Sequence, residues 1–96
     1  MKHSEASITT ERASIYLQQL CKHFAHRLPV EFTPDRGQIT FSVGTCRLVA
    51  DSGVLTLYAD AADAAQLAQL QDVIVKHLLR FAFRDPPTIT WTARPA

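Results

Sequence analysis

The strongest constraint on the fold is a run of three short alternating segments between residues 38 and 59. Alternate side chains are apolar in each segment: Ile39, Phe41 and Val43, then Cys46 and Leu48, then Leu55 and Leu57. A period of two puts one set of side chains on one face of a β-strand. The turns at Gly44 and at residues 51–53 are too short to hold a crossover helix. We therefore expect antiparallel hairpins with one apolar face that other elements must cover.

Two amphipathic helices are predicted on either side of this run. The first carries a stripe of Ala13, Leu17, Leu20 and Phe24, and the second a stripe of Leu67, Leu70, Ile74, Leu78 and Phe81. Thr9 or Thr10 is expected to cap the first helix, which ends at Leu28 because Pro29 follows. Asp60 or Asp63 is expected to cap the second, which residues 85–87 stop.

Further strands are predicted at residues 30–33, before a turn at 34–37, and at residues 88–92, where Ile89 and Trp91 share a face. The expected fold is α+β, with two helices packed on one face of a largely antiparallel sheet and the order (β)-α-β-β-β-β-α-β. Residues 1–8 are expected to be a flexible tail or a short edge strand. Residues 9–96 are expected to form a single α+β domain.

Composition narrows the class of protein. The 96 residues are 47% hydrophobic, which suits one globular domain, and the net charge of +1 without a basic stripe argues against nucleic-acid binding. Cys21 and Cys46 lack metal or redox spacing and are expected to be buried in a reducing compartment. The polar N-terminus and the short apolar runs indicate neither a signal peptide nor a membrane span. A cytoplasmic location is expected.

Enzyme motifs do not emerge from the sequence. GxSxG, GxGxxG and P-loop patterns are absent, and Asp35, Asp51, Asp60 and Asp63 lie where turns and caps use carboxylates. A triad assembled from distant residues stays open as an alternative. The sequence therefore favours a non-enzymatic domain, and it requires no cofactor.

The histidines are the most informative polar residues. His23 and His26 are three residues apart on the first helix, and His23 and His77 flank the buried stripes of their helices in the same manner. If the helices pack side by side, His23 and His77 meet in the groove between them. One hypothesis is a metal site for iron or zinc formed by His23, His26 and His77. The alternative is that these are boundary histidines that pack one side of the ring and hydrate the other.

A basic and aromatic cluster ends the second helix. Arg80 and Arg84, with Phe81 and Phe83, are joined by Lys22, Arg27 and Lys76 in a predicted cationic patch for an anionic ligand. The alternative is that these cations cap helix carbonyls and oppose the helix dipole, which requires no ligand.

The outer face of the predicted sheet is polar. It carries Thr40, Ser42, Arg47, Thr56, Tyr58, Thr90 and Thr92. This face is either an ordinary solvated surface or a docking surface, so the chain is expected to be a monomer or a homodimer.

Three segments resemble a known bacterial family. They are YLQQLCKHFAHR at residues 16–27, GTCRL at 44–48 and HLLRFAFR at 77–84, followed by Trp91 in the last strand. Together they resemble domain of unknown function family 2218. The resemblance implies short bacterial proteins that occur beside, or fused to, siderophore-interacting flavin reductases and iron-uptake genes. It implies no catalytic residues.

These observations combine in one functional hypothesis and two alternatives. The hypothesis is an accessory or ligand-binding domain in cytoplasmic siderophore-iron handling, with a ferric siderophore or another anionic small molecule as ligand and a siderophore-interacting reductase as partner. His23, His26, His77, Arg80 and Arg84 are the candidate ligand-binding residues. The alternatives are a homodimerising interaction module and a small enzyme acting through His23 or His77.

Overall fold

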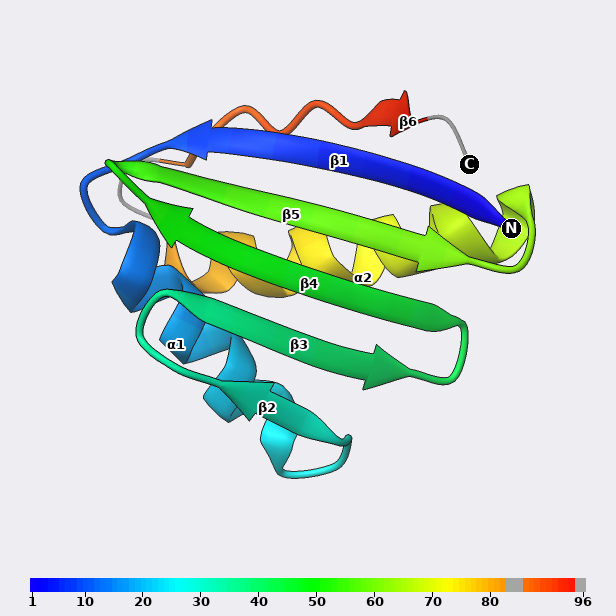
Figure 1. Cartoon of the computed structure of the whole chain (residues 1–96), viewed down its shortest axis with the longest axis horizontal. Coiled ribbons are helices and arrows are strands. Elements are labelled where there is room, and N and C mark those ends of the chain that lie inside the picture. Colours follow the sequence, from blue (N-terminus) through cyan, green and yellow to red (C-terminus); the bar gives the residue numbers. More distant parts are fainter. Residues whose placement is uncertain (83–85, 95–96) are drawn as a thin grey trace.

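The computed structural model describes residues 1–82 and 86–94 and contains two layers, a sheet and a pair of helices (Figure 1). The elements are β1 (Lys2–Thr9), α1 (Ala13–Ala25), β2 (Val30–Phe32), β3 (Arg36–Phe41), β4 (Gly44–Asp51), β5 (Val54–Ala61), α2 (Ala64–Phe81) and β6 (Thr92–Arg94). The strands form one sheet in the order β2-β3-β4-β5-β1-β6, and every neighbouring pair is antiparallel. The predicted α+β fold and element order are confirmed.

The β4–β5 hairpin turns over two residues, within the turn predicted at residues 51–53. Asp51 pairs with Val54, and between them Ser52 and Gly53 have φ angles of 51° and 76°. Two consecutive positive φ values are the geometry of the tight hairpin turn that matches strand twist. Gly53 suits the second position because it has no Cβ to strain.

Gly37 is needed for space rather than for a turn. The turn predicted at residues 34–37 ends earlier, because β3 begins at Arg36 and Gly37 pairs with Leu48 inside the sheet. A Cβ on Gly37 would lie 2.7 Å from the Sγ atom of Cys21. The missing side chain therefore lets α1 pack directly on β3.

The helices cover one face of the sheet with the predicted stripes. Ala13, Leu17, Leu20 and Cys21 of α1 and Leu70, Ile74 and Leu78 of α2 are buried. Asp63 caps α2, since its Oδ1 atom accepts the Gln66 N–H at 2.8 Å. The predicted threonine cap of α1 is wrong, because the N-cap residue is Arg12 and makes no side-chain cap hydrogen bond; the Thr10 hydroxyl accepts the N–H of Arg12 at 3.1 Å. α1 ends at Ala25 rather than at Leu28. Both cysteines are buried free thiols, and burial raises the pKa of Cys21 to about 11.

The N-terminal segment is a full strand and not a tail or a short edge strand. Lys2–Thr9 pairs with β5 along its whole length, and His3, Ser4 and Glu5 pair with β6 on the other side. Its inward side chains are Ser4, Ala6 and Ile8. The Ser4 hydroxyl accepts a hydrogen bond from Gln71 Nε2 of α2 at 2.7 Å. Serine and alanine differ little in hydrophobicity from the outward-facing residues of this segment, so the sequence shows only a weak period of two here.

The last strand also differs from its prediction at residues 88–92. Regular pairing is confined to Thr92–Arg94 opposite β1. Ile89 and Trp91 still pack against the core, so their alternation is real although ladder bonds do not form there. Pro86 and Pro87 lie just before this stretch and lack the N–H that a ladder needs, so no strand begins at either residue.

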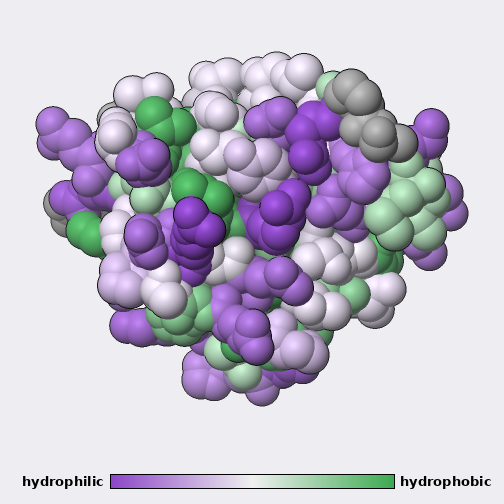
Figure 2. Space-filling model, in the orientation of Figure 1, coloured by the Kyte–Doolittle hydropathy of each residue, from purple (hydrophilic) through white to green (hydrophobic). Residues whose placement is uncertain are grey.

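The other face of the sheet is open. Figure 2, in the same orientation as Figure 1, shows mostly hydrophilic residues on it with scattered hydrophobic ones. Within the described ranges, no helix is long and apolar enough to cross a membrane.

Candidate functional site

The two helices bring His23 and His77 into contact on the covered side of the sheet. His23 lies near the end of α1 and His77 in the second half of α2. The Nε2 atom of His23 lies 2.9 Å from the Nδ1 atom of His77, a hydrogen-bonding distance. The ring centroids are 4.8 Å apart at an interplanar angle of 39°. One nitrogen must donate and the other accept, so the two rings share one hydrogen at their contact.

Phenylalanine rings surround this pair. The Phe24 centroid lies 5.0 Å from that of His23 and 4.9 Å from that of His77. Phe81 approaches His23 at 5.9 Å, and Phe41 of β3 supports Phe24 from the sheet at 4.9 Å. These distances are typical of packed aromatic pairs. The histidine contact therefore has an apolar floor and sides.

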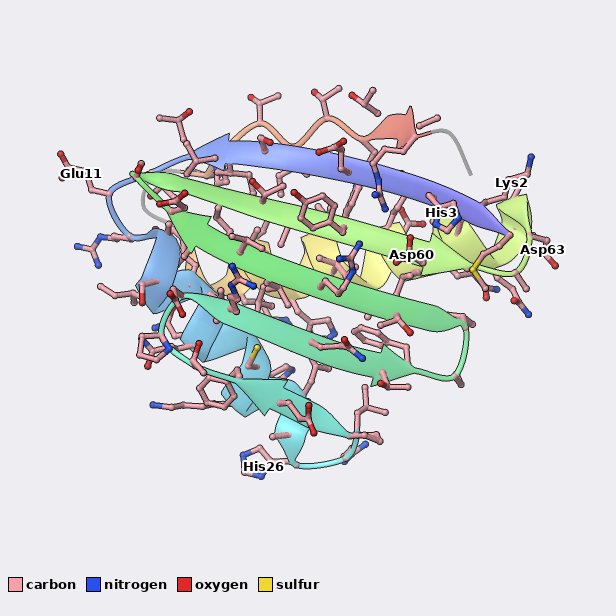
Figure 3. All side chains as sticks on the ribbon, in the orientation of Figure 1. Lys2, His3, Glu11, His26, Asp60 and Asp63 are labelled. Carbon is pink, nitrogen blue, oxygen red and sulfur yellow. The ribbon has the colours of Figure 1, made fainter. Side chains whose placement is uncertain are left out.

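A cavity of about 520 Å³ opens beside the pair. It is lined by His23, Phe24, His26, Arg27, Leu28 and His77. His26 is exposed and lies at the far end of α1 (Figure 3). In the described part of the chain, the lining contains no carboxylate. The cavity thus combines aromatic surface with groups that are cationic or can become so.

His77 has a pKa below its ordinary value of 6.5. Burial is the main cause, and the charges of Arg80, His23 and Lys76 lower the pKa further. Burial and nearby cations both disfavour the imidazolium form. His77 is therefore held as a neutral imidazole near pH 7.

The three-histidine metal site is not assembled in this geometry. A zinc site takes three or four protein ligands, whereas only two rings meet here and their facing nitrogens bond each other. Among residues 1–82 and 86–94, no group of three His, Cys, Asp or Glu side chains is arranged to hold a metal ion. His26 shares the cavity but does not join the pair, because it follows the last residue of α1 and faces solvent. In the described part of the chain these three histidines therefore do not form a three-ligand group.

Residues 5–92 match the family DUF2218, described as an uncharacterized protein conserved in bacteria. The chain belongs to the DUF2218 family. The family resemblance seen in the sequence is therefore confirmed.

A solved structure agrees with this assignment. The NMR structure of PA4090 from Pseudomonas aeruginosa is 36% identical to this DUF2218 chain, with a TM-score of 0.81 and 96% of each chain covered. A search of curated proteins found no match.

The predicted basic cluster of the DUF2218 chain is described only in part. Arg80 is exposed in the last turn of α2, close enough to His77 to affect its pKa. Arg84 and Phe83 lie outside the described residues. Arg27 joins the cavity from the turn after α1.

Sequence reasoning missed a second polar cluster, on the open face. Asp60 of β5 accepts hydrogen bonds from His3 of β1 and from Arg94 of β6, the latter at 3.0 Å. Arg47 of β4 lies 3.9 Å from the other oxygen of the Asp60 carboxylate. The guanidinium groups of Arg47 and Arg94 lie 4.9 and 5.0 Å from the centre of the Tyr58 ring.

This Asp60 cluster links four strands of the DUF2218 fold. His3 and Asp60 lie side by side on the open face (Figure 3). The sequence predicts a helix cap at Asp60 or Asp63, and a flexible tail or short edge strand at residues 1–8; the cap is Asp63, and Asp60 joins this cluster instead. The available signal was the alternation of His3 and Glu5 with Ser4 and Ala6, which puts His3 on the outer face. The cluster holds the ends of β1 and β6 to the centre of the sheet.

Proposed function

We propose that this chain is a non-enzymatic binding domain that takes up an anionic small molecule beside the His23–His77 pair. The observation that carries the proposal is the composition of the cavity lining. Arg27 and three histidines lie there beside Phe24 and Leu28, and the described lining contains no carboxylate. Its volume of about 520 Å³ is in the range of small-molecule sites.

The chemistry of the lining favours a flat, oxygen-rich anion. The guanidinium of Arg27 can pair with a carboxylate or catecholate through two parallel hydrogen bonds. Phe24 offers apolar aromatic surface to a ring of the ligand. Arg80 adds positive charge from α2. An aromatic anion satisfies all three features at once.

Binding is favoured over catalysis because of how the histidines are used. A general base is usually oriented by a carboxylate and leaves a nitrogen facing the substrate. Here the facing nitrogens of His23 and His77 bond each other, so each ring orients the other. This arrangement suits a binding surface with a tunable charge.

Within this class of aromatic anions, we propose that the ligand is a ferric siderophore and that the chain acts in cytoplasmic iron handling. The resemblance to family 2218 implies that context, and a catecholate siderophore carries both aromatic rings and negative charge. Its iron is already coordinated by the siderophore's own oxygens, so the cavity does not have to supply a complete ligand set. The paired histidines and Arg27 offer hydrogen-bond donors to the outer oxygens of such a complex.

The test is a titration of the protein with a ferric tris-catecholate siderophore. Ferric iron broadens NMR signals, so the gallium(III) complex serves for mapping. We expect shifts at His23, His77 and Arg27, and little response to a ferric trihydroxamate that lacks the negative charge. Arg27→Gln should weaken binding by about tenfold, in line with one lost charge-assisted contact.

The matched control is Arg36→Gln, an exposed arginine of β3 on the open side of the sheet. It changes the net charge by the same amount and should leave the affinity unchanged. Absence of shifts at the cavity at millimolar ligand, for the siderophore and for a simple aromatic carboxylate alike, would refute the proposal.

A further inference from the structure

The His23–His77 contact limits how many protons the pair can hold. With both rings neutral, one facing nitrogen donates and the other accepts across 2.9 Å. Either ring can be the donor, since each has one facing nitrogen. Each ring also has a second nitrogen that faces away from the contact.

One added proton preserves the contact. It occupies an outer nitrogen, and the resulting imidazolium donates to its neutral partner in a charge-assisted hydrogen bond. A second added proton would put N–H groups on both facing nitrogens, which then repel at 2.9 Å. The pair therefore has a capacity of one additional proton while the helices stay in place.

The surroundings disfavour that proton when the cavity holds no anion. From α1 and the turn after it come Lys22, His26 and Arg27, and from α2 come Lys76 and Arg80. The sheet contributes Phe41, an apolar ring, behind Phe24. No described side chain of the lining carries a negative charge. The lowered pKa of His77 agrees with this excess of positive charge and with the burial of the ring.

An anion in the cavity would lie against His23, His77 and Arg27, and its negative charge would favour the added proton. We infer that anion binding in this cavity is coupled to the uptake of one proton by the His23–His77 pair. The inference rests on the proposed function and adds a regulatory property to it. By linkage, binding strengthens as pH falls, by up to about tenfold per pH unit where the free pair is neutral.

The experiment measures proton uptake directly. Isothermal titration calorimetry with 2,3-dihydroxybenzoate at pH 7.5, in buffers of different ionisation enthalpy, gives the number of protons taken up per bound anion. We expect about one proton for the unchanged protein, falling toward zero at acid pH where the free pair is already protonated. The ring NMR signals of His77 should titrate at higher pH when the anion is present.

Variants separate the pair from its neighbours. His77→Asn removes the partner of His23 across the contact and should lower the proton uptake, while Arg36→Gln, an exposed position of β3 outside the cavity, should retain it. Backbone amide spectra check that both variants fold, and the ring titration of the unchanged protein is decisive if His77→Asn does not. Binding without proton uptake would overturn the inference and leave the proposed function standing. Absence of binding to the unchanged protein would overturn the proposed function and the inference with it.

Discussion

The contact between His23 and His77 makes the charge of each ring depend on the other. Sequence periodicity predicted that the two side chains meet if the helices pack side by side, because both flank buried stripes, and the structure brings them together. It was insufficient to distinguish a histidine pair from a three-histidine site. That distinction depends on where α1 ends, and His26 lies one residue beyond the end. The last turn of a helix is a local outcome that a hydrophobic pattern does not specify.

The lowered pKa of His77 predicts how stability depends on pH. In the unfolded chain this histidine takes up its proton near pH 6.5, whereas the folded protein takes it up only at lower pH. The unfolded state therefore binds more protons below pH 6.5, and the free energy of unfolding falls as pH decreases through that window. Well above pH 6.5 the contribution of His77 to the free energy of unfolding is fully present.

Urea unfolding followed at several pH values between 5 and 8 measures this slope. His77→Asn should make the slope below pH 6.5 shallower, and His26→Asn serves as the control for loss of an exposed histidine. An unchanged slope in His77→Asn would contradict the assignment of this stability to His77.

At the scale of elements, strong patterns were predicted and weak ones were not. The stripes of α1 and α2 and the tight turn at residues 51–53 are encoded by large apolar side chains and by a glycine at positive φ. β1 was missed because Ser4 and Ala6 occupy its buried positions. Burial of Ser4 depends on Gln71, a hydrogen-bond partner 67 residues away, which no local window contains.

Substitutions in β1 distinguish a structural strand from a tail. Ile8 is 3% exposed and faces the core, whereas its neighbour Ser7 is exposed on the other face. Ile8→Ala should lower the free energy of unfolding by about 2–4 kcal/mol, because it leaves a cavity in the core. Ser7→Ala should change it by less than about 0.5 kcal/mol. Equal, small effects in chemical denaturation would mean that the segment is not part of the cooperative unit.

At the scale of the whole molecule, the two faces of the sheet have different roles. The covered face carries the core and the cavity, and the open face carries the Asp60 cluster. That cluster could not be predicted from local sequence, because His3, Asp60 and Arg94 come together only when β1 is inserted between β5 and β6. Long-range order of strands thus decides which polar side chains meet.

Removal of the Asp60 charge should destabilise the whole sheet. The Asp60 side chain is 19% exposed, and its carboxylate lies within ion-pairing distance of His3, Arg94 and Arg47. Asp60→Asn should therefore cost about 1–2 kcal/mol of unfolding free energy, since Arg94 loses its charged partner. Asp72→Asn, an exposed position on α2, is the matched control. Thermal unfolding that shifts equally in both variants would show that the cluster contributes nothing specific.

The position of β1 has a consequence for how the protein is made. Lys2 pairs with Ala61, so β1 has no β5 partner until residues 54–61, which follow it in the chain, have been synthesised. Until then residues 2–9 stay unpaired with β5, and Ala6 and Ile8, which are buried in the folded protein, remain in contact with water. The meander from β2 to β5 can form earlier, because its partners lie close together in the chain. β1 is therefore synthesised before the meander but joins the sheet after it.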